Sequence, residues 1–186
     1  MGEELDGSSE TRYSPLTTAR YSMRLIPLIL VAVAALSLTG CDNERLARKN
    51  AVEGETFMKE NATAQGIQLL KDGVQYRVIA SGPPGGVKPV KGDEIKVHYE
   101  GKLLSGEVFD SSFDRGAPAI MPLERLIPAW MEVIPMMRPG DEWVIYVPPE
   151  VGYGKEGAGS IPPNAVLVFR IKLLGVLPAR GNSAMG

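Results

Sequence analysis

Apolar and polar residues alternate along the second half of the chain, in short segments that glycines and prolines separate. The alternation is clearest at Ile95, Val97 and Tyr99, each of which is followed by a polar residue. A period of two places every second side chain on the same face of a β-strand. A more nearly continuous apolar run covers 166–174. We therefore predict strands over 74–81, 94–104, 142–147 and 166–176, within one sheet-rich domain over 73–177.

One short helix is predicted between the second and third of these strands. Pro128 fits its first turn, where a missing N–H loses no hydrogen bond, and Pro135 ends it. Its predicted apolar face consists of Ile127, Trp130, Met131 and Ile134. A sheet and a helix with one apolar face each bury those faces by packing together. The predicted fold class is therefore α+β, with an antiparallel sheet of about five strands wrapped over one short helix.

An apolar run over 25–38 follows Arg24 and leads to Cys41. The run is shorter than the roughly 18 to 20 residues that a membrane-spanning helix needs, and its layout is typical of a secretory signal peptide, here 23–40. The residues 38–41, LTGC, resemble the bacterial lipobox, which implies cleavage before Cys41 and lipidation of its thiol. The alternatives are an uncleaved signal anchor and a buried free thiol.

Three other segments complete the predicted organisation. Residues 1–22 are polar and carry acidic residues where a signal peptide has basic ones, so we interpret them as an untranslated or disordered extension, with translation beginning at Met23. Residues 41–72 form the lipid anchor and a polar tether, with one modest helix over 53–65. Residues 178–186 form a disordered tail.

Composition narrows the possible functions. The net charge of −2 provides no basic surface for nucleic acid, which is therefore not an expected partner. The single cysteine excludes an internal disulfide, and one histidine without a cysteine cluster gives no usual zinc site. We expect neither a metal nor another cofactor.

Five motifs occur in order along the predicted domain: VHYEG at 97–101, VFDSS at 108–112 with DRG at 114–116, LIPAW at 126–130, VGYG at 151–154 with IPPN at 161–164, and LVF at 167–169. Their order and spacing resemble the FKBP family of peptidyl-prolyl cis/trans isomerases over 73–176. The segment 57–76 is similar to the linker of the macrophage-infectivity-potentiator branch, whose long dimerising helical region is missing here. We therefore expect a monomer.

The resemblance implies a half-barrel sheet around the short helix, with an aromatic pocket between them. It implies catalytic roles for Tyr99, Phe109, Asp110, Ile127, Trp130, Tyr153 and Phe169, and substrate-binding roles for Arg115, Leu126 and Ile161. Among these, the Ile127 N–H and the Tyr153 hydroxyl would face the substrate, and Arg115 would hold Asp110 in place. Taken singly, each aromatic residue would more often be part of the core.

The implied reaction is rotation about the peptide bond that precedes proline. The barrier is about 18 to 20 kcal/mol because rotation breaks amide resonance. No covalent bond is made or broken, so a dry pocket that orients the chain is sufficient. The expected partners are proline-containing polypeptides, the membrane through lipidated Cys41, and macrolide inhibitors. The expected location is the periplasmic side of the inner or outer membrane. The alternative function is a non-catalytic module or chaperone that binds proline-containing segments.

Two residues depart from the simplest interpretation of these motifs. Ala119 occupies a position where many FKBP relatives carry a pocket aromatic residue, so one wall of the pocket should be thinner. His98 invites a role as a general base, but strand alternation directs it away from the face that carries Val97 and Tyr99. We therefore expect His98 to make a structural hydrogen bond.

Overall fold

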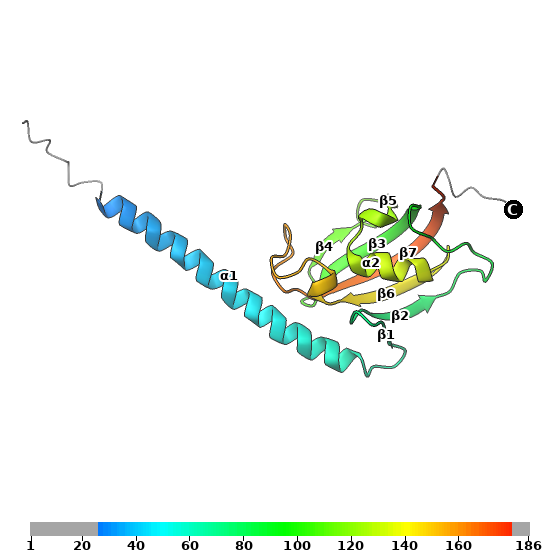
Figure 1. Ribbon diagram of the computed structural model, residues 1–186, viewed down its shortest axis with the longest axis horizontal. Helices are drawn as coiled ribbons and strands as arrows, with labels where there is room; N and C mark the ends of the chain where they lie inside the picture. Colours follow the sequence, from blue (N-terminus) through cyan, green and yellow to red (C-terminus); the bar gives the residue numbers. More distant parts are fainter. Residues whose placement is uncertain (1–25, 180–186) are drawn as a thin grey trace, which may run out of the picture. The chain divides into compact units, whose positions relative to one another are not determined.

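The computed structural model describes residues 26–179, with side chains from residue 42 onward (Figure 1). The predicted extension 1–22, the start of the signal segment, the tail beyond 179 and the Cys41 side chain lie outside the described part. The elements in order are α1 (Ile26–Asn61), β1 (Gln68–Leu69), β2 (Gln75–Ala80), β3 (Glu94–Leu103), β4 (Val108–Ser111), β5 (Ala119–Pro122), η1 (Leu123–Arg125), α2 (Pro128–Val133), η2 (Ile134–Met136), β6 (Glu142–Val147), η3 (Pro149–Val151) and β7 (Leu167–Leu177).

The strands form one seven-stranded sheet in the order β1-β2-β6-β7-β3-β4, with β5 also paired to β3. All of the pairings are antiparallel. The predicted α+β class is confirmed, and the four predicted strands correspond to β2, β3, β6 and β7. The expected number of strands was too low because β1, β4 and β5 have only two to four residues. Such short strands carry too little alternation to be recognised.

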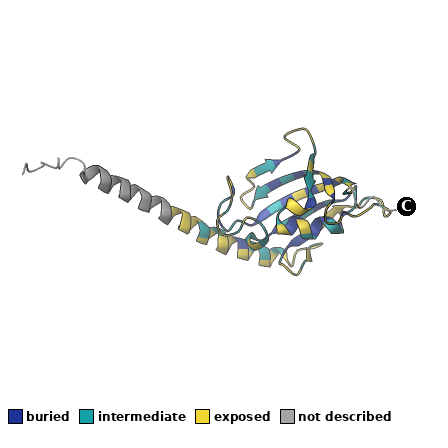
Figure 2. Cartoon of the chain, turned by 45° about the horizontal axis from the view of Figure 1, so that its top comes forward, coloured by how far each residue is buried: buried dark blue, intermediate teal, exposed yellow. Residues whose placement is uncertain are grey.

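The core lies between the sheet and α2 (Figures 1 and 2). Alternate residues of β3, including Ile95, Val97 and Tyr99, are buried against the helix side. Pro128 occupies the first turn of α2, as predicted. The predicted apolar face was wrong at Met131, which is 39% exposed. In a helix of six residues, Ala129, Trp130 and Val133 already face the sheet, and Met131 is rotated about 100° from Trp130 toward solvent.

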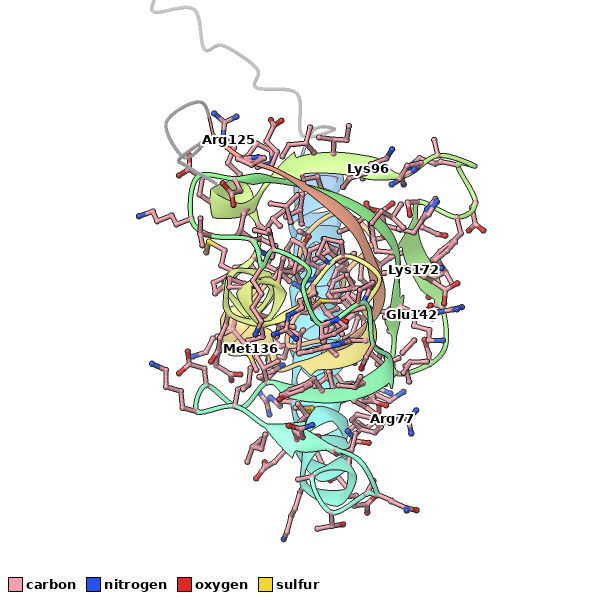
Figure 3. All side chains as sticks on the ribbon, turned by 90° about the vertical axis from the view of Figure 1, so that its right-hand side faces the viewer. Arg77, Lys96, Arg125, Met136, Glu142 and Lys172 are labelled. Atoms are coloured by element: carbon pink, nitrogen blue, oxygen red, sulfur yellow. The ribbon has the colours of Figure 1, made fainter. Side chains whose placement is uncertain are left out.

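The opposite face of the sheet is charged. Figure 3 shows Arg77, Lys96, Glu142 and Lys172 projecting from this outer face, on the side away from Met136. The Arg170 guanidinium donates a hydrogen bond to the Glu142 carboxylate at 2.6 Å. This face carries the charged side chains of the sheet, and the opposite, apolar face builds the core and any pocket.

Helix α1 differs from the modest helix that we predicted over 53–65, because it runs from Ile26 to Asn61. The described helical residues up to Leu38 belong to a separate unit, and the helix from Thr39 onward belongs to the unit of the sheet. Ion pairs one turn apart, Glu44 with Arg48 and Lys49 with Glu53, support the polar part of the helix. Among the described residues, no helix combines the length and apolar character needed to cross a membrane.

A narrow stripe of α1 packs on the sheet domain. The Asn50 side chain donates to the Pro163 carbonyl at 2.8 Å, and Phe57 packs on Tyr146 with 5.6 Å between ring centroids. A Cβ added at Gly54 would lie 2.8 Å from a methyl group of Val166, so the glycine allows the helix to approach closely. These contacts recur every three or four residues, at helical spacing. The segment 41–72 that we predicted as a tether is therefore helical as far as Asn61, and it docks on the domain through Asn50, Gly54 and Phe57.

Candidate functional site

A cavity of about 310 Å³ opens between the sheet and α2. This volume is within the range of small-molecule and peptide side-chain sites. Its lining comes from β3, β4, β5, α2, β7 and the loops that connect them, and consists of Tyr99, Phe109, Asp110, Met121, Arg125, Leu126, Ile127, Trp130, Tyr153 and Phe169. The lining therefore combines several aromatic rings with a small number of polar groups.

Four aromatic rings form the walls and floor in a continuous edge-to-face chain. The Phe109 and Phe169 rings are 5.6 Å apart at 88°, and the Phe169 and Trp130 rings are 5.3 Å apart at 85°. Tyr99 completes the chain at 5.4 Å and 86° from Trp130. Perpendicular rings at this spacing attract each other through their quadrupoles. Each ring comes from a different element, so the cavity exists only when all four elements are assembled.

Gly101 makes room for two of these rings. In the sheet, Gly101 of β3 is opposite Asp110 of β4 and Phe169 of β7. A Cβ added at Gly101 would lie 2.6 and 2.7 Å from carbon atoms of the Phe109 and Phe169 rings. Gly101 is not among the residues with positive φ, so the glycine is needed for space and not for backbone conformation. Sequence reasoning gave it no role, although an isolated glycine within a regular strand was a usable signal.

A charged network closes the Tyr99 side of the cavity. The Tyr99 hydroxyl and the Arg115 guanidinium both donate hydrogen bonds to the Asp110 carboxylate. Arg115 also donates to the Tyr99 hydroxyl oxygen at 2.9 Å and lies over the Tyr99 ring. The predicted pairing of Arg115 with Asp110 is therefore present. Because the carboxylate accepts hydrogen bonds from both neighbours, its charge is already partly satisfied within the protein.

The network changes the acidity of its members. Burial raises the pKa of the Asp110 carboxyl, but hydrogen bonds from Tyr99 and Arg115 and the charge of Arg115 outweigh burial, so its pKa lies below the ordinary value. Burial and the neighbouring Asp110 raise the pKa of the Tyr99 phenol. At neutral pH, Asp110 is therefore ionised and Tyr99 remains a hydrogen-bond donor.

The rim provides groups that remain available to a ligand. Leu126 and Ile127 have extended backbones between η1 and α2. The carbonyl of Ile127 accepts the first bonds of α2, from Trp130 at 2.9 Å and Met131 at 3.2 Å. Within residues 42–179 no acceptor is found for the Ile127 N–H or for a hydrogen bond from the Tyr153 hydroxyl. Both groups can therefore bind the backbone of a bound peptide.

The structure gathers eight of the ten predicted catalytic and substrate-binding residues around this cavity. Arg115 stands behind Asp110 and does not line the cavity. Ile161 is 8% exposed, belongs to the core and is not part of the cavity lining; it pairs with Ala158 in an isolated β-bridge. Ala119 packs against the core, and β5 contributes Met121 to the lining in its place. Sequence reasoning missed Met121 and Arg125, which the family motifs do not include.

His98 points to the other face of the sheet. Its Nδ1 atom lies 3.1 Å from the Ser112 hydroxyl, and its ring stacks on Phe113 at 4.8 Å. Ser112 accepts a hydrogen bond from the Tyr99 N–H at 2.7 Å. These contacts agree with a structural hydrogen-bonding residue and leave no route from His98 to the cavity.

Other hollows in the domain lack this chemistry. A groove beside α1 measures about 400 Å³ and is lined by mixed charged and apolar residues, including Lys49, Glu53 and Leu103. It contains no aromatic ring. Within the described residues, no three histidine, cysteine, aspartate or glutamate side chains gather closely enough to hold a metal ion. The aromatic cavity is therefore the best candidate for a functional site.

Comparison with known families gives a consistent picture. Residues 85–174 match the family described as FKBP-type peptidyl-prolyl cis-trans isomerase, and residues 35–78 match the domain described as amino-terminal to it. The peptidyl-prolyl cis-trans isomerase Mip of Coxiella burnetii is 44% identical over 128 residues, which cover 68% of this chain and 55% of that protein.

Two further relatives extend the comparison. The outer membrane protein MIP of Legionella longbeachae is 38% identical over 134 residues, which cover 72% of this chain and 57% of that protein. The crystal structure of FkpA from Escherichia coli superimposes with a TM-score of 0.78 at 34% identity, covering 87% of this chain and 76% of that one. The chain thus spans a little over half the length of the curated relatives it matches.

Replacing Gly101 with alanine is expected to displace the Phe109 and Phe169 rings, because the new Cβ would overlap both of them. Overpacking of this kind lowers the free energy of unfolding by about 1–3 kcal/mol. Urea unfolding and near-ultraviolet circular dichroism measure the two effects. Gly175→Ala is the control, since no atom lies within 4 Å of the Cβ position at this glycine of β7. Equal behaviour of the two variants would contradict the spacing role of Gly101.

Replacing Arg115 with glutamine is expected to raise the pKa of Asp110 toward its ordinary value, as followed by carboxyl-carbon NMR during an acid titration. Because the folded-state pKa of Asp110 is depressed, its ion pair stabilises the fold above the unfolded-state pKa of about 3.9. This contribution disappears as the pH falls through the lower, folded-state pKa. Arg170→Gln, which removes the ion pair with Glu142 on the outer face, should leave the Asp110 titration unchanged. An identical Asp110 titration in Arg115→Gln would show that the pair does not set the pKa.

Proposed function

Because this chain belongs to the family of FKBP-type peptidyl-prolyl cis-trans isomerases, we propose that its aromatic cavity accelerates rotation about the peptide bond before proline in polypeptide substrates. The observation that carries the proposal is the edge-to-face chain of Tyr99, Trp130, Phe169 and Phe109, which surrounds a hollow of about 310 Å³. A proline ring is small, apolar and rigid, and it suits such a hollow.

Catalysis of this rotation depends on preference for the twisted amide over the planar forms. A planar amide is more polar because resonance places partial charges on its oxygen and nitrogen. Apolar walls exclude the water that stabilises those charges, and they hold the proline ring while the preceding carbonyl turns. No nucleophile and no electron carrier takes part in these steps.

The polar groups of the rim orient the flanking chain. The Ile127 N–H would donate to a substrate carbonyl, and the Tyr153 hydroxyl would donate to another. Both act beside apolar walls, where hydrogen bonds are stronger than in water. Asp110 would face the turning amide with its charge partly satisfied by Tyr99 and Arg115. In this role Arg115 positions Asp110 and does not itself contact the substrate.

We also propose that the protein is a lipoprotein of the cell envelope, with a signal peptide over 23–40 that is removed, a lipid on Cys41 and the isomerase domain facing the periplasm. The proposal is supported by the apolar run that ends in LTGC at 38–41 and by the relative named outer membrane protein MIP. Several acyl chains would be required, since a single chain binds membranes only marginally.

Phe109→Ala and Asp110→Ala are expected to lower kcat/KM for a proline-containing peptide by roughly tenfold or more. Burial of a phenylalanine side chain is worth about 1.5–3 kcal/mol, and each 1.4 kcal/mol of lost transition-state stabilisation is tenfold in rate. A protease-coupled isomerisation assay provides the rates, with urea unfolding to verify the fold. Phe57→Ala is the control, since Phe57 packs on Tyr146 outside the cavity.

Unchanged rates in both pocket variants would refute the assignment of the cavity. A wild-type protein that prevents aggregation of unfolded clients but shows no rate enhancement would instead establish the alternative function, a non-catalytic module that binds proline-containing segments.

Cys41→Ser is expected to release the protein from the membrane fraction and to remove the acyl mass from its amino terminus. Fractionation of producing cells followed by mass spectrometry of the purified protein gives both results. Ser37→Ala, a change within the apolar run, should leave the lipid in place. A membrane-bound Cys41→Ser protein without acyl chains would favour the uncleaved signal anchor.

A further inference from the structure

Arg125 places a guanidinium group at the mouth of the aromatic cavity. It is the last residue of η1 and belongs to the cavity lining, and its side chain is exposed. Figure 3 labels Arg125 well apart from Arg77, which lies on the outer face of the sheet. Within residues 42–179, none of the five ion pairs includes Arg125. Its positive charge is therefore available to a bound polypeptide.

The charge of Arg125 is not balanced by the rest of the lining. The other ionised residue of the lining is Asp110, and its carboxylate is already engaged by Arg115 and Tyr99. Glu124 precedes Arg125 in η1, but it is not part of the lining. The Arg125 guanidinium therefore gives the mouth of the cavity a positive charge, next to the ion pair of Asp110 with Arg115. The chain as a whole has a net charge of −2.

The backbone of Arg125 is held in place. Leu123, two residues earlier, is 2% exposed, and its N–H donates to the Asp93 carbonyl at 3.0 Å. Asp93 is itself buried, and its carboxylate accepts from the Val90 N–H at 2.9 Å. Two residues after Arg125 comes Ile127, whose N–H is proposed to bind the substrate backbone. The guanidinium thus starts from a fixed point beside the path of the substrate.

Resting on the proposed function, we propose that Arg125 determines sequence preference, and that the protein favours polypeptides with an aspartate or glutamate side chain within one or two residues of the proline. A carboxylate at that distance from the prolyl ring can reach a group on the rim. The site is solvated, so the effect is modest. Exposed ion pairs of this kind correspond to roughly a twofold to fivefold change at low ionic strength, and the effect declines as salt shortens the screening length.

The test uses the full-length protein in detergent and a set of otherwise identical peptides. Each peptide carries Glu, Gln or Lys immediately before proline, and a second set carries them immediately after proline. In at least one set, kcat/KM is expected to be highest for the Glu peptide, intermediate for the Gln peptide and lowest for the Lys peptide. The differences between the three peptides should become smaller at high salt. In Arg125→Gln the differences in kcat/KM among the peptides should disappear, and in Arg125→Glu the order of the peptides should reverse. Arg77→Gln is the matched control, because it removes the same charge from an exposed residue of β2 and should keep the wild-type order.

The outcomes separate this proposal from the proposed function. Turnover without charge discrimination in the wild type, or the same discrimination in Arg125→Gln, overturns the role of Arg125 and leaves the isomerase assignment standing. Absence of turnover for every peptide overturns the isomerase assignment. In that case the binding constants of the same peptides, labelled with a fluorophore, replace the rates. An order of affinity that depends on Arg125 then supports the charge preference, and one that does not depend on it rejects the preference.

Discussion

Edge-to-face packing among Tyr99, Phe109, Trp130 and Phe169 is the interaction on which the rest of the site depends. These perpendicular rings bound the hollow between the sheet and α2. The pairing of β3 with β7 places Tyr99 opposite Ile171 and Gly101 opposite Phe169. A shift of one residue in this register would turn the rings to the charged face.

Tyr99 connects the packing of the cavity to its electrostatics. Its ring edge contacts Trp130, and its hydroxyl donates to Asp110. Arg115 reaches both the carboxylate and the phenol. The apolar floor and the charged wall are therefore not independent parts, since a change in either one moves the residue that they share.

The sequence predicted the parts of the fold that have strong periodicity. The bounds of β6 agree at both ends, and β3 ends within one residue of its predicted end. The extent of α1 was not predictable from amphipathicity, because only a narrow stripe that includes Asn50, Gly54 and Phe57 docks on the domain. Likewise, β4 and β5 depend on pairing with β3 and not on their own composition.

Site residues that belong to a recognisable motif could be predicted from the sequence. Site residues that reach the cavity only through the arrangement of the fold could not. Phe109, Asp110 and Trp130 stand in recognisable motifs and line the cavity. Ile161 stands in a motif as well, but it packs in the core and is not part of the cavity lining. Met121 of β5 and Arg125 of η1 line the cavity because of where these two short elements lie in the fold, which alternation alone does not reveal. Met121 lies in β5, a strand of four residues that is too short to predict. Arg125 lies in η1, a single helical turn of three residues.

Asn164 links the loop that begins at Tyr153 to helix α1. Its backbone has a positive φ of 55°, its N–H donates to the Gly154 carbonyl at 3.0 Å, and its side chain donates to the Ala47 carbonyl of α1 at 3.1 Å. The loop that begins at Tyr153 is therefore fastened at its far end to a helix that lies outside the sheet. A fragment trimmed to the strands would keep every ring of the cavity and lose this attachment of the loop to α1.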